Sequence, residues 1–166
     1  MPVEDDSFKT SMLTIQSITA EQTYPLRHAV LWPDKPFDYV KIDNDEEGYH
    51  YGAFRRGELV AVISLFIEND VTNAPEAERP VGRSGTANPG RARFRKFATR
   101  PDCQRMGIGT QLMQHIIAEA RRMIVTTLWC DARLDVADFY RRFGMEPVSD
   151  VFYKGTISYA KFSLTL

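Results

Sequence analysis

The sequence lacks several features that would each point to a particular class of protein. It holds two cysteines, Cys103 and Cys130, far apart in the chain and without the short spacings of metal ligands. No apolar run approaches the roughly 20 residues that a membrane-spanning helix needs. The formal net charge of −1 supplies no excess of positive charge to attract nucleic acid or anionic lipid. We therefore expect no metal site, no nucleic-acid or membrane partner, and two cysteines that serve as small buried apolar residues.

Length and local composition limit the domain organisation. The 166 residues suffice for one domain with a sizeable core and are too few for two ordinary domains. Residues 1–11 are polar, and their acidic start differs from the basic start of a signal peptide. Residues 70–92 hold several prolines and glycines and little hydrophobicity, which predicts a long mobile loop. We expect a cytoplasmic protein with one domain over residues 12–166.

Hydrophobic periodicity predicts a chain that alternates between strands and helices. Residues 12–18 alternate between apolar and polar side chains, as a strand does. Thr19 followed by Gln22 is the pattern of a capping box, which predicts a helix that continues to Leu31. The acidic residues 37–48 receive no assignment. Further strands are predicted at 49–54, 58–68, 93–99, 125–130, 151–153 and 157–166, and further helices at 108–123 and 137–143, the latter stopped by Gly144.

The most informative stretch is Gln104-Arg105-Met106-Gly107-Ile108-Gly109-Thr110, between a predicted strand and a strongly amphipathic helix. Glycine lets the backbone approach a ligand without a Cβ clash. The first N–H groups of a helix have no helical partner and lie at the positive end of its dipole. The stretch lacks the lysine of a P-loop and is not the full G-x-G-x-x-G of dinucleotide-binding folds. We therefore expect this stretch to bind an anionic diphosphate.

The spacing Gln104-x-x-Gly107-x-Gly109 resembles the [Q/R]-x-x-G-x-[G/A] signature of the GNAT superfamily of N-acetyltransferases, which bind the pyrophosphate of acetyl-CoA there. Taken alone, the pattern also fits a glycine-rich helix cap. The preceding strand, the Phe139–Met145 segment and the closing hairpin add to the resemblance, which spans roughly residues 12–166. It implies an α/β (α+β) fold, with a mixed, twisted sheet of six to seven strands and helices on both faces.

The resemblance assigns acetyl-CoA as the acetyl donor and places it on two segments. The backbone of the strand at 93–99 would hydrogen-bond the pantetheine arm and the thioester, although an ordinary paired strand is the alternative. The N–H groups of the turn would cradle the pyrophosphate, and Arg105 would add a charge unless it is only a solvated surface residue. The cofactor-binding residues implied are Phe97, Ala98, Thr99, Gln104, Arg105, Met106, Gly107, Ile108, Gly109 and Thr110.

Acetyl transfer to an amine also needs a proton donor for the thiolate and a base for the amine. The resemblance assigns the donor to Tyr140, because the family often carries a tyrosine at this point and a phenol stays protonated at neutral pH. A core tyrosine is the alternative. Glu68 is our choice for the base, with His50 and Asp131 as further candidates. Each of the three also fits an ordinary strand or strand-end residue, and the base is unnecessary if the amine arrives neutral.

Two positions depart from the family pattern. Many relatives carry an asparagine about seven residues before the tyrosine, where this chain has Arg133, whose role stays open. The closing hairpin resembles that of a bacterial subgroup but lacks its Pro-His pair, so that subgroup's substrate preference does not transfer. Residues that would line the acceptor pocket, or else belong to the core, are Leu26, Trp32, Tyr51, Phe66, Tyr153 and Tyr159.

We therefore predict an acetyl-CoA-dependent N-acetyltransferase that acts on a small-molecule amine or a protein amino group by direct transfer in a ternary complex. A non-catalytic acyl-CoA-binding module is the alternative, because no base stands out. A nucleotide- or phosphate-binding protein unrelated to CoA is a third possibility that rests on the glycine turn alone. Homodimers are frequent in the family, which makes a homodimer possible here.

Overall fold

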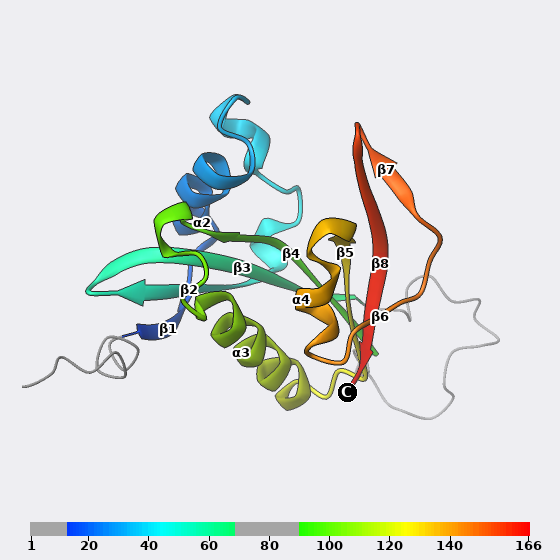
Figure 1. Ribbon diagram of the computed structural model, residues 1–166. Coiled ribbons are helices and arrows are strands. Elements are labelled where there is room, and N and C mark those ends of the chain that lie inside the picture. Colours follow the sequence, from blue (N-terminus) through cyan, green and yellow to red (C-terminus); the bar gives the residue numbers. More distant parts are fainter. Residues whose placement is uncertain (1–12, 69–89) are drawn as a thin grey trace, which may run out of the picture. The chain divides into compact units, whose positions relative to one another are not determined.

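The computed structural model describes residues 13–68 and 90–166 (Figure 1). These residues form two compact units, and the chain passes between them within β3 (Glu58–Glu68), β4 (Arg91–Thr99) and α3 (Ile108–Arg122). The first unit holds the described residues up to 65 and residues 96–116, and the second holds the rest. The predicted loose segment 1–11 and most of the predicted loop 70–92 lie outside the described residues. The single domain over residues 12–166 stays a prediction.

The first unit contains an antiparallel arrangement of β1 (Leu13–Ile18), β2 (Tyr49–Arg55) and β3. Ile15 pairs with Ala53, which in turn pairs with Ala61. Strands β2 and β3 are joined by a tight turn at Arg56 and Gly57, both with positive φ, so the predicted hairpin is confirmed. The apolar run of β3 is fully buried, as expected of a strand covered on both faces.

Helix α2 (Ala20–Leu26) begins at the predicted capping box. The Thr19 N–H donates to Gln22 Oε1 at 2.9 Å, and the Gln22 N–H donates to Thr19 Oγ1 at 3.2 Å. The helix continues to the predicted end as a wider π-helical turn, η1 (Arg27–Leu31), just after Pro25 removes one backbone donor. The unassigned residues 37–48 form two short 3-10 turns, η2 (Phe37–Val40) and η3 (Asp45–Glu47).

The second unit contains a mixed sheet in the order β4, β5 (Thr127–Arg133), β8 (Ile157–Thr165) and β6 (Glu146–Pro147). Strand β4 runs parallel to β5, and all other pairs of this unit are antiparallel, including β7 (Phe152–Lys154) with β8. The predicted mixed sheet is confirmed. The described residues contain eight strands rather than six to seven, because the two-residue β6 is too short to leave a periodic pattern.

Two strand boundaries differ from the prediction because tertiary pairing extends them. Strand β4 begins at Arg91, inside the predicted loop, where the Gly90 carbonyl accepts the N–H groups of Thr126 and Thr127. Strand β5 continues past Cys130 to Arg133, because β8 supplies partners as far as Tyr159. Neither partner lies near these residues in the sequence, so local periodicity does not reveal the extension.

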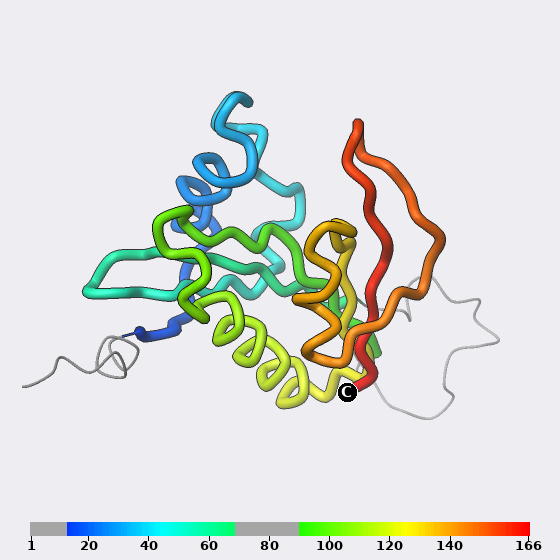
Figure 2. The backbone as a smooth tube through the Cα atoms, in the orientation of Figure 1, coloured from blue at the N-terminus to red at the C-terminus, as the bar shows by residue number. Residues whose placement is uncertain are grey.

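After β5 the chain forms the 3-10 turn η7 (Leu134–Val136) and the short helix α4 (Ala137–Arg141) (Figure 2). The predicted stop at Gly144 is confirmed by its positive φ of 89°. Buried side chains of β5 and β8, among them Leu128, Cys130 and Phe162, form the core of this unit. None of the helices in the described ranges has the length and apolar character needed to cross a membrane.

Candidate functional site

The glycine turn lies between η6 (Pro101–Cys103) and helix α3, as the sequence predicted. Arg105 and Gly107 both have left-handed backbone angles, with φ of 63° and 80°. A Cβ atom built on Gly107 would meet no other atom within 4 Å, so the space beside this residue is open. The Gln104 side chain fastens the turn to the preceding strand by donating from Nε2 to the Thr99 carbonyl oxygen at 3.1 Å.

The backbone N–H groups of this turn are unusual in having no acceptor. Within the described residues, none of the six N–H groups from Arg105 to Thr110 donates a hydrogen bond, and the Gln111 N–H is the first to do so, to the Gly107 carbonyl at 3.1 Å. A helix of 15 residues follows, whose dipole places partial positive charge at the same point. The turn is therefore suited to bind an anion through its backbone.

The arginines near the turn differ in their availability. Arg100 is bound by Asp102, with two contacts of 2.7 Å, and by Glu58 at 3.2 Å. These hydrogen bonds from Arg100 lower the pKa of Asp102 to about 2. Arg55 lies beside the turn, with Nη1 at 3.5 Å from Met106 Sδ. The exposed Arg105 side chain has no charged partner within the described residues, so Arg55 and Arg105 are the cations free to meet an anion here.

Strand β4 carries a backbone irregularity in its middle. Its parallel pairing with β5 joins Arg91–Arg93 to Thr127–Trp129, and Lys96 then adopts a left-handed φ of 56°. Such an angle in a residue other than glycine costs roughly 1–3 kcal/mol and is concentrated at functional sites. Of the predicted cofactor residues that follow, the Ala98 side chain belongs to the core of the first unit, with Leu26 and Val62.

Tyr140 lies on α4 in the second unit, with its ring among those of Phe94, Phe139 and Phe162. The ring therefore packs against aromatic side chains, and the role of Tyr140 as a proton donor stays a prediction. The hydroxyl group has no hydrogen-bond partner within the described residues. Burial raises the pKa of Tyr140 above its usual value, and the neighbouring Cys130 adds to the effect. The phenol therefore keeps its proton over a wide pH range.

His50 is unsuited to act as a base. Its side chain is buried, with Nε2 at 2.7 Å from the Asp45 carbonyl oxygen and Nδ1 at 2.6 Å from Ser64 Oγ. Because a carbonyl oxygen only accepts, Nε2 must carry the proton, and Nδ1 then accepts from the Ser64 hydroxyl. No lone pair of the imidazole is left for a substrate. The same contacts exclude Ser64 as a nucleophile, since its side chain is wholly buried.

Asp131 is also a poor base, because three cations hold its carboxylate. Arg93 Nη2 lies at 2.7 Å, Lys161 Nζ at 3.2 Å and Lys154 Nζ at 3.3 Å. Burial alone would raise the pKa of Asp131, but the hydrogen bond from Lys161 and the nearby positive charges lower it below its usual value.

Glu68 keeps part of its carboxylate available. Its Oε1 accepts the Trp129 indole N–H at 2.6 Å and lies 4.0 Å from Arg91 Nε. Its Oε2 has no partner within the described residues, and about a third of the side chain, 35%, is exposed. Of the three predicted candidates, Glu68 therefore retains the geometry of a base best.

The two cysteines are buried and free, as predicted. Burial raises the pKa of the Cys130 thiol, and the adjacent Asp131 charge raises it further, so the thiol stays protonated. A thiol nucleophile for a covalent acetyl-enzyme is therefore not available at Cys130. Among residues 13–68 and 90–166, no three histidine, cysteine, aspartate or glutamate side chains form a group that would hold a metal ion.

Comparison with known proteins adds to this geometry. Residues 13–145 match the model of the acetyltransferase (GNAT) family. The chain belongs to the GNAT family of acetyltransferases. It is 27% identical over 143 residues to a protein of Bacillus subtilis (strain 168) named uncharacterized N-acetyltransferase YitI. The aligned residues cover 85% of this chain and 87% of that protein.

Solved structures of acetyltransferases have the same fold. A putative N-acetyltransferase from Lactobacillus plantarum has a TM-score of 0.71 and 16% identity, covering 93% of this chain and 98% of that one. A GNAT family acetyltransferase from Elizabethkingia anophelis, solved with acetyl-CoA bound, has a TM-score of 0.65 and 16% identity, covering 93% and 99%. The predicted family, the fold class and the activity class of an acetyltransferase are confirmed.

In this GNAT chain, Arg133 forms an exposed pair with Asp135 through two contacts of 3.1 and 2.7 Å. The side chain at the position where many relatives carry an asparagine is therefore engaged locally. The predicted acceptor-pocket residues separate into three groups. Leu26, Tyr51 and Phe66 are buried in the core, which was the alternative for them, Tyr153 is exposed, and Trp32 and Tyr159 are partly buried.

Sequence reasoning missed two groups of residues. Trp129 donates to Glu68 from 61 residues away and lies under the side chains of Arg93 and Lys161, a cluster with no local signal. Arg27 forms a buried ion pair with Asp45, which stands in the segment that received no assignment. One signal of this ion pair is present in the sequence: Arg27 stands beside Leu26 on the apolar face of a predicted helix, and a buried arginine needs a charged partner.

Proposed function

We propose that this GNAT protein transfers an acetyl group from acetyl-CoA to a primary amine, on a small molecule or a protein, by direct transfer in a ternary complex. The observation that carries the proposal is the set of six backbone N–H groups, in the glycine turn and the first residues of α3, that have no acceptor within the described residues. The structure from Elizabethkingia anophelis that has acetyl-CoA bound supports the choice of donor.

The turn would hold the pyrophosphate of the donor. Backbone N–H groups from Arg105, Met106, Gly107, Ile108, Gly109 and Thr110 supply hydrogen bonds without a lysine or a metal ion. Arg55 and Arg105 supply compensating charge, and the open space beside Gly107 leaves room for the phosphate oxygens. Gln104 does not contact the pyrophosphate in this proposal; its side chain donates to the Thr99 carbonyl and so holds the turn against β4.

Strand β4 would carry the pantetheine arm along the backbone of Phe97, Ala98 and Thr99. The buried Ala98 side chain anchors the strand in the core, so only its backbone remains for the cofactor. The Thr99 carbonyl is engaged by Gln104, and we assign the polarisation of the thioester oxygen to backbone N–H groups of this segment.

Tyr140 and Glu68 would manage the two protons of the reaction. The amine nitrogen forms a C–N bond with the acetyl carbonyl carbon while the C–S bond breaks. Tyr140 donates its proton to the departing thiolate; burial keeps its pKa raised, so the phenol carries that proton at neutral pH, and its hydroxyl has no competing partner within the described residues. Glu68 first takes a proton from the substrate ammonium, directly or through one water, at Oε2, which has no partner within the described residues, and the nitrogen loses its second proton to solvent as the C–S bond breaks. Acid and base each return to their starting state by exchange with solvent.

A binding experiment separates this function from its alternatives. We expect calorimetry to show heat of association with acetyl-CoA and none with ATP. We also expect free-thiol release from acetyl-CoA to rise with at least one amine among spermidine, tyramine and an alanine-terminated peptide. Binding of acetyl-CoA without amine-dependent release would instead identify an acyl-CoA-binding module. Equal binding of ATP would identify a nucleotide-binding protein.

The assignment of the base predicts a specific pH dependence. Glu68→Gln keeps an acceptor for the Trp129 N–H but removes the base, so kcat should fall about 100-fold near neutral pH. Above about pH 9 more of the amine arrives neutral, and the loss should shrink. Asp131→Asn is the matched control and should change kcat much less. A loss in Glu68→Gln that persists unchanged at alkaline pH would refute a role as base.

A further inference from the structure

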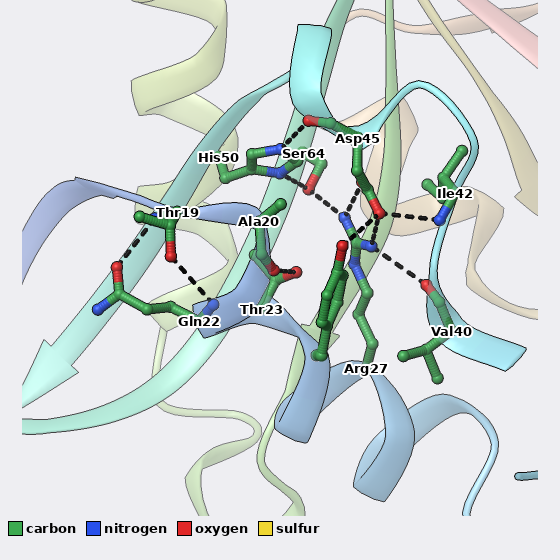
Figure 3. A network of polar contacts seen from close by, with 11 residues as sticks. Thr19, Ala20, Gln22, Thr23, Arg27, Val40, Ile42, Asp45, His50 and Ser64 are labelled. Atoms are coloured by element: carbon green, nitrogen blue, oxygen red, sulfur yellow. Dashed lines mark hydrogen bonds and ion pairs between the residues drawn. The ribbon is translucent and has the colours of Figure 1, made fainter. Parts of the chain in front are cut away.

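The first unit contains a buried ion pair that the proposed chemistry does not use (Figure 3). The Arg27 side chain is fully buried, and Asp45 is 4% exposed. Nη1 and Nη2 of Arg27 each donate to one oxygen of the Asp45 carboxylate at 2.9 Å. The Asp45 pKa, which burial alone would raise, lies below its usual value because of the Arg27 hydrogen bonds and the Ile42 N–H.

The pair ties together parts of the chain that are distant in sequence. From η1, Arg27 also donates to the Val40 carbonyl at 3.1 Å and to Ser64 Oγ on β3 at 2.9 Å. The Ile42 N–H donates to Asp45 at 2.8 Å, and Ser64 continues the chain of hydrogen bonds to His50 on β2. As Figure 3 shows, one guanidinium group therefore fixes the segment of η2 and η3 against a helix and two strands.

Stability alone is a weak reason for this arrangement. Two charges lose their hydration on burial, and apolar residues of similar size often stabilise a protein as well or better. Arg27 Nε also has no partner within the described residues, which adds an uncompensated cost. What the pair does supply is geometry, because a bidentate contact admits one relative placement of its two partners.

The segment that the pair fixes carries the exposed rings of Phe37 and Tyr39, and the partly buried Trp32 ends the preceding turn η1. We call these three rings the aromatic surface. Phe37 and Tyr39 are 47% and 53% exposed. The rings of Trp32 and Tyr39 meet edge to face with centroids 5.3 Å apart, and Phe37 meets the His28 ring at 5.6 Å. Large apolar side chains held outside the core in this way are typical of binding surfaces.

The aromatic surface lies next to the strand that would hold the thioester. Lys96 Nζ is 4.1 Å from the centre of the Trp32 ring, and Lys96 immediately precedes the proposed cofactor segment Phe97–Thr99 on β4. Lys35 Nζ lies 5.4 Å from the Tyr39 ring. Two of these rings therefore make cation–π contacts with lysine ammonium groups of this chain. A substrate amine is an ammonium ion in neutral water, so it can make the same kind of contact with an aromatic ring.

We propose that the Arg27–Asp45 pair is a positioning device for the amine acceptor, holding the aromatic surface beside β4 so that it receives an organic ammonium group. The inference rests on the proposed function. Arg27 and Asp45 are positioning residues, because they act through the segment they fix. The Tyr39 ring, in contrast, would touch the acceptor.

The test compares acceptor use with donor binding. Asp45→Asn leaves a buried arginine unpaired and is at risk of unfolding, so the main variant is the double change Arg27→Met, Asp45→Leu, which fills the same space with apolar atoms. In this variant and in Tyr39→Ala we expect kcat/KM for tyramine or spermidine to fall about tenfold or more. The acetyl-CoA Kd from calorimetry should stay unchanged.

Thr19→Ala is the matched control, because it removes the capping box of the same helix without touching the ion pair. It should weaken stability while leaving kcat/KM for the amine unchanged. Equal kcat/KM in the double variant and in Thr19→Ala would overturn the inference. A wild type that binds acetyl-CoA but acetylates neither amine would overturn it as well. A wild type that fails to bind acetyl-CoA would overturn the proposed function itself, which distinguishes the two failures.

Discussion

Replacement of Tyr140 by phenylalanine is expected to lower turnover about 100-fold while acetyl-CoA binds as tightly as before. The aromatic ring stays among Phe94, Phe139 and Phe162, so the core of the second unit is preserved. The hydroxyl has no partner within the described residues, and its removal should leave the melting temperature unchanged. Free-thiol release from acetyl-CoA measures turnover, and calorimetry measures binding.

The control for this variant is Tyr153→Phe, which removes the hydroxyl of a 68% exposed tyrosine on β7 and should leave turnover unchanged. The pH profile of the wild type provides a second check. Because burial raises the Tyr140 pKa, kcat should show no alkaline decline from loss of this proton below about pH 10. Full turnover in Tyr140→Phe would remove the residue from the mechanism.

Replacement of Gly107 by alanine is expected to weaken acetyl-CoA binding about tenfold or more, which corresponds to about 1.4 kcal/mol. The added Cβ enters open space where the phosphate oxygens would lie, and the φ of 80° disfavours any residue with a side chain. Relief of that strain would turn the backbone N–H groups away from the ligand. The acetyl-CoA Kd of the purified variant tests this expectation by calorimetry.

Gly155→Ala separates the loss of binding from backbone strain. Gly155 also has a positive φ, of 63°, and a Cβ there also meets no atom within 4 Å. It lies in the turn between β7 and β8, so its replacement should cost similar stability and leave the acetyl-CoA Kd unchanged. If both variants bind acetyl-CoA equally well, the turn at Gly107 is not the phosphate site.

The sequence predicted what depends on near neighbours in the chain. The capping box at Thr19 and Gln22, the hairpin of β2 and β3, and the stop at Gly144 are all set by backbone preferences within a few residues. The glycine turn belongs to the same class, because the unpartnered N–H groups follow from a helix that begins beside it. These features were predicted correctly because local and tertiary preferences agree.

The choice among candidate bases required the folded chain. The sequence alone offered Glu68 as the first choice and His50 and Asp131 as further candidates, all at or near the end of a predicted strand. In the structure His50 uses both ring nitrogens, Asp131 is held by three cations, and Glu68 keeps one oxygen without a partner among the described residues. Desolvation and nearby charge decide whether a carboxylate or an imidazole can take a proton, and both depend on groups far away in the chain.

By itself the sequence determined most of the strands and helices and the place of the glycine turn before α3, because hydrophobic periodicity and backbone preference act over a few residues. Only the tertiary structure decided that Arg27 meets Asp45 and that Trp129 meets Glu68. Buried polar groups are stable only with partners, and the partner here lies 18 or 61 residues away. No local pattern encodes such a distance, so these contacts exist only once the sheet has formed.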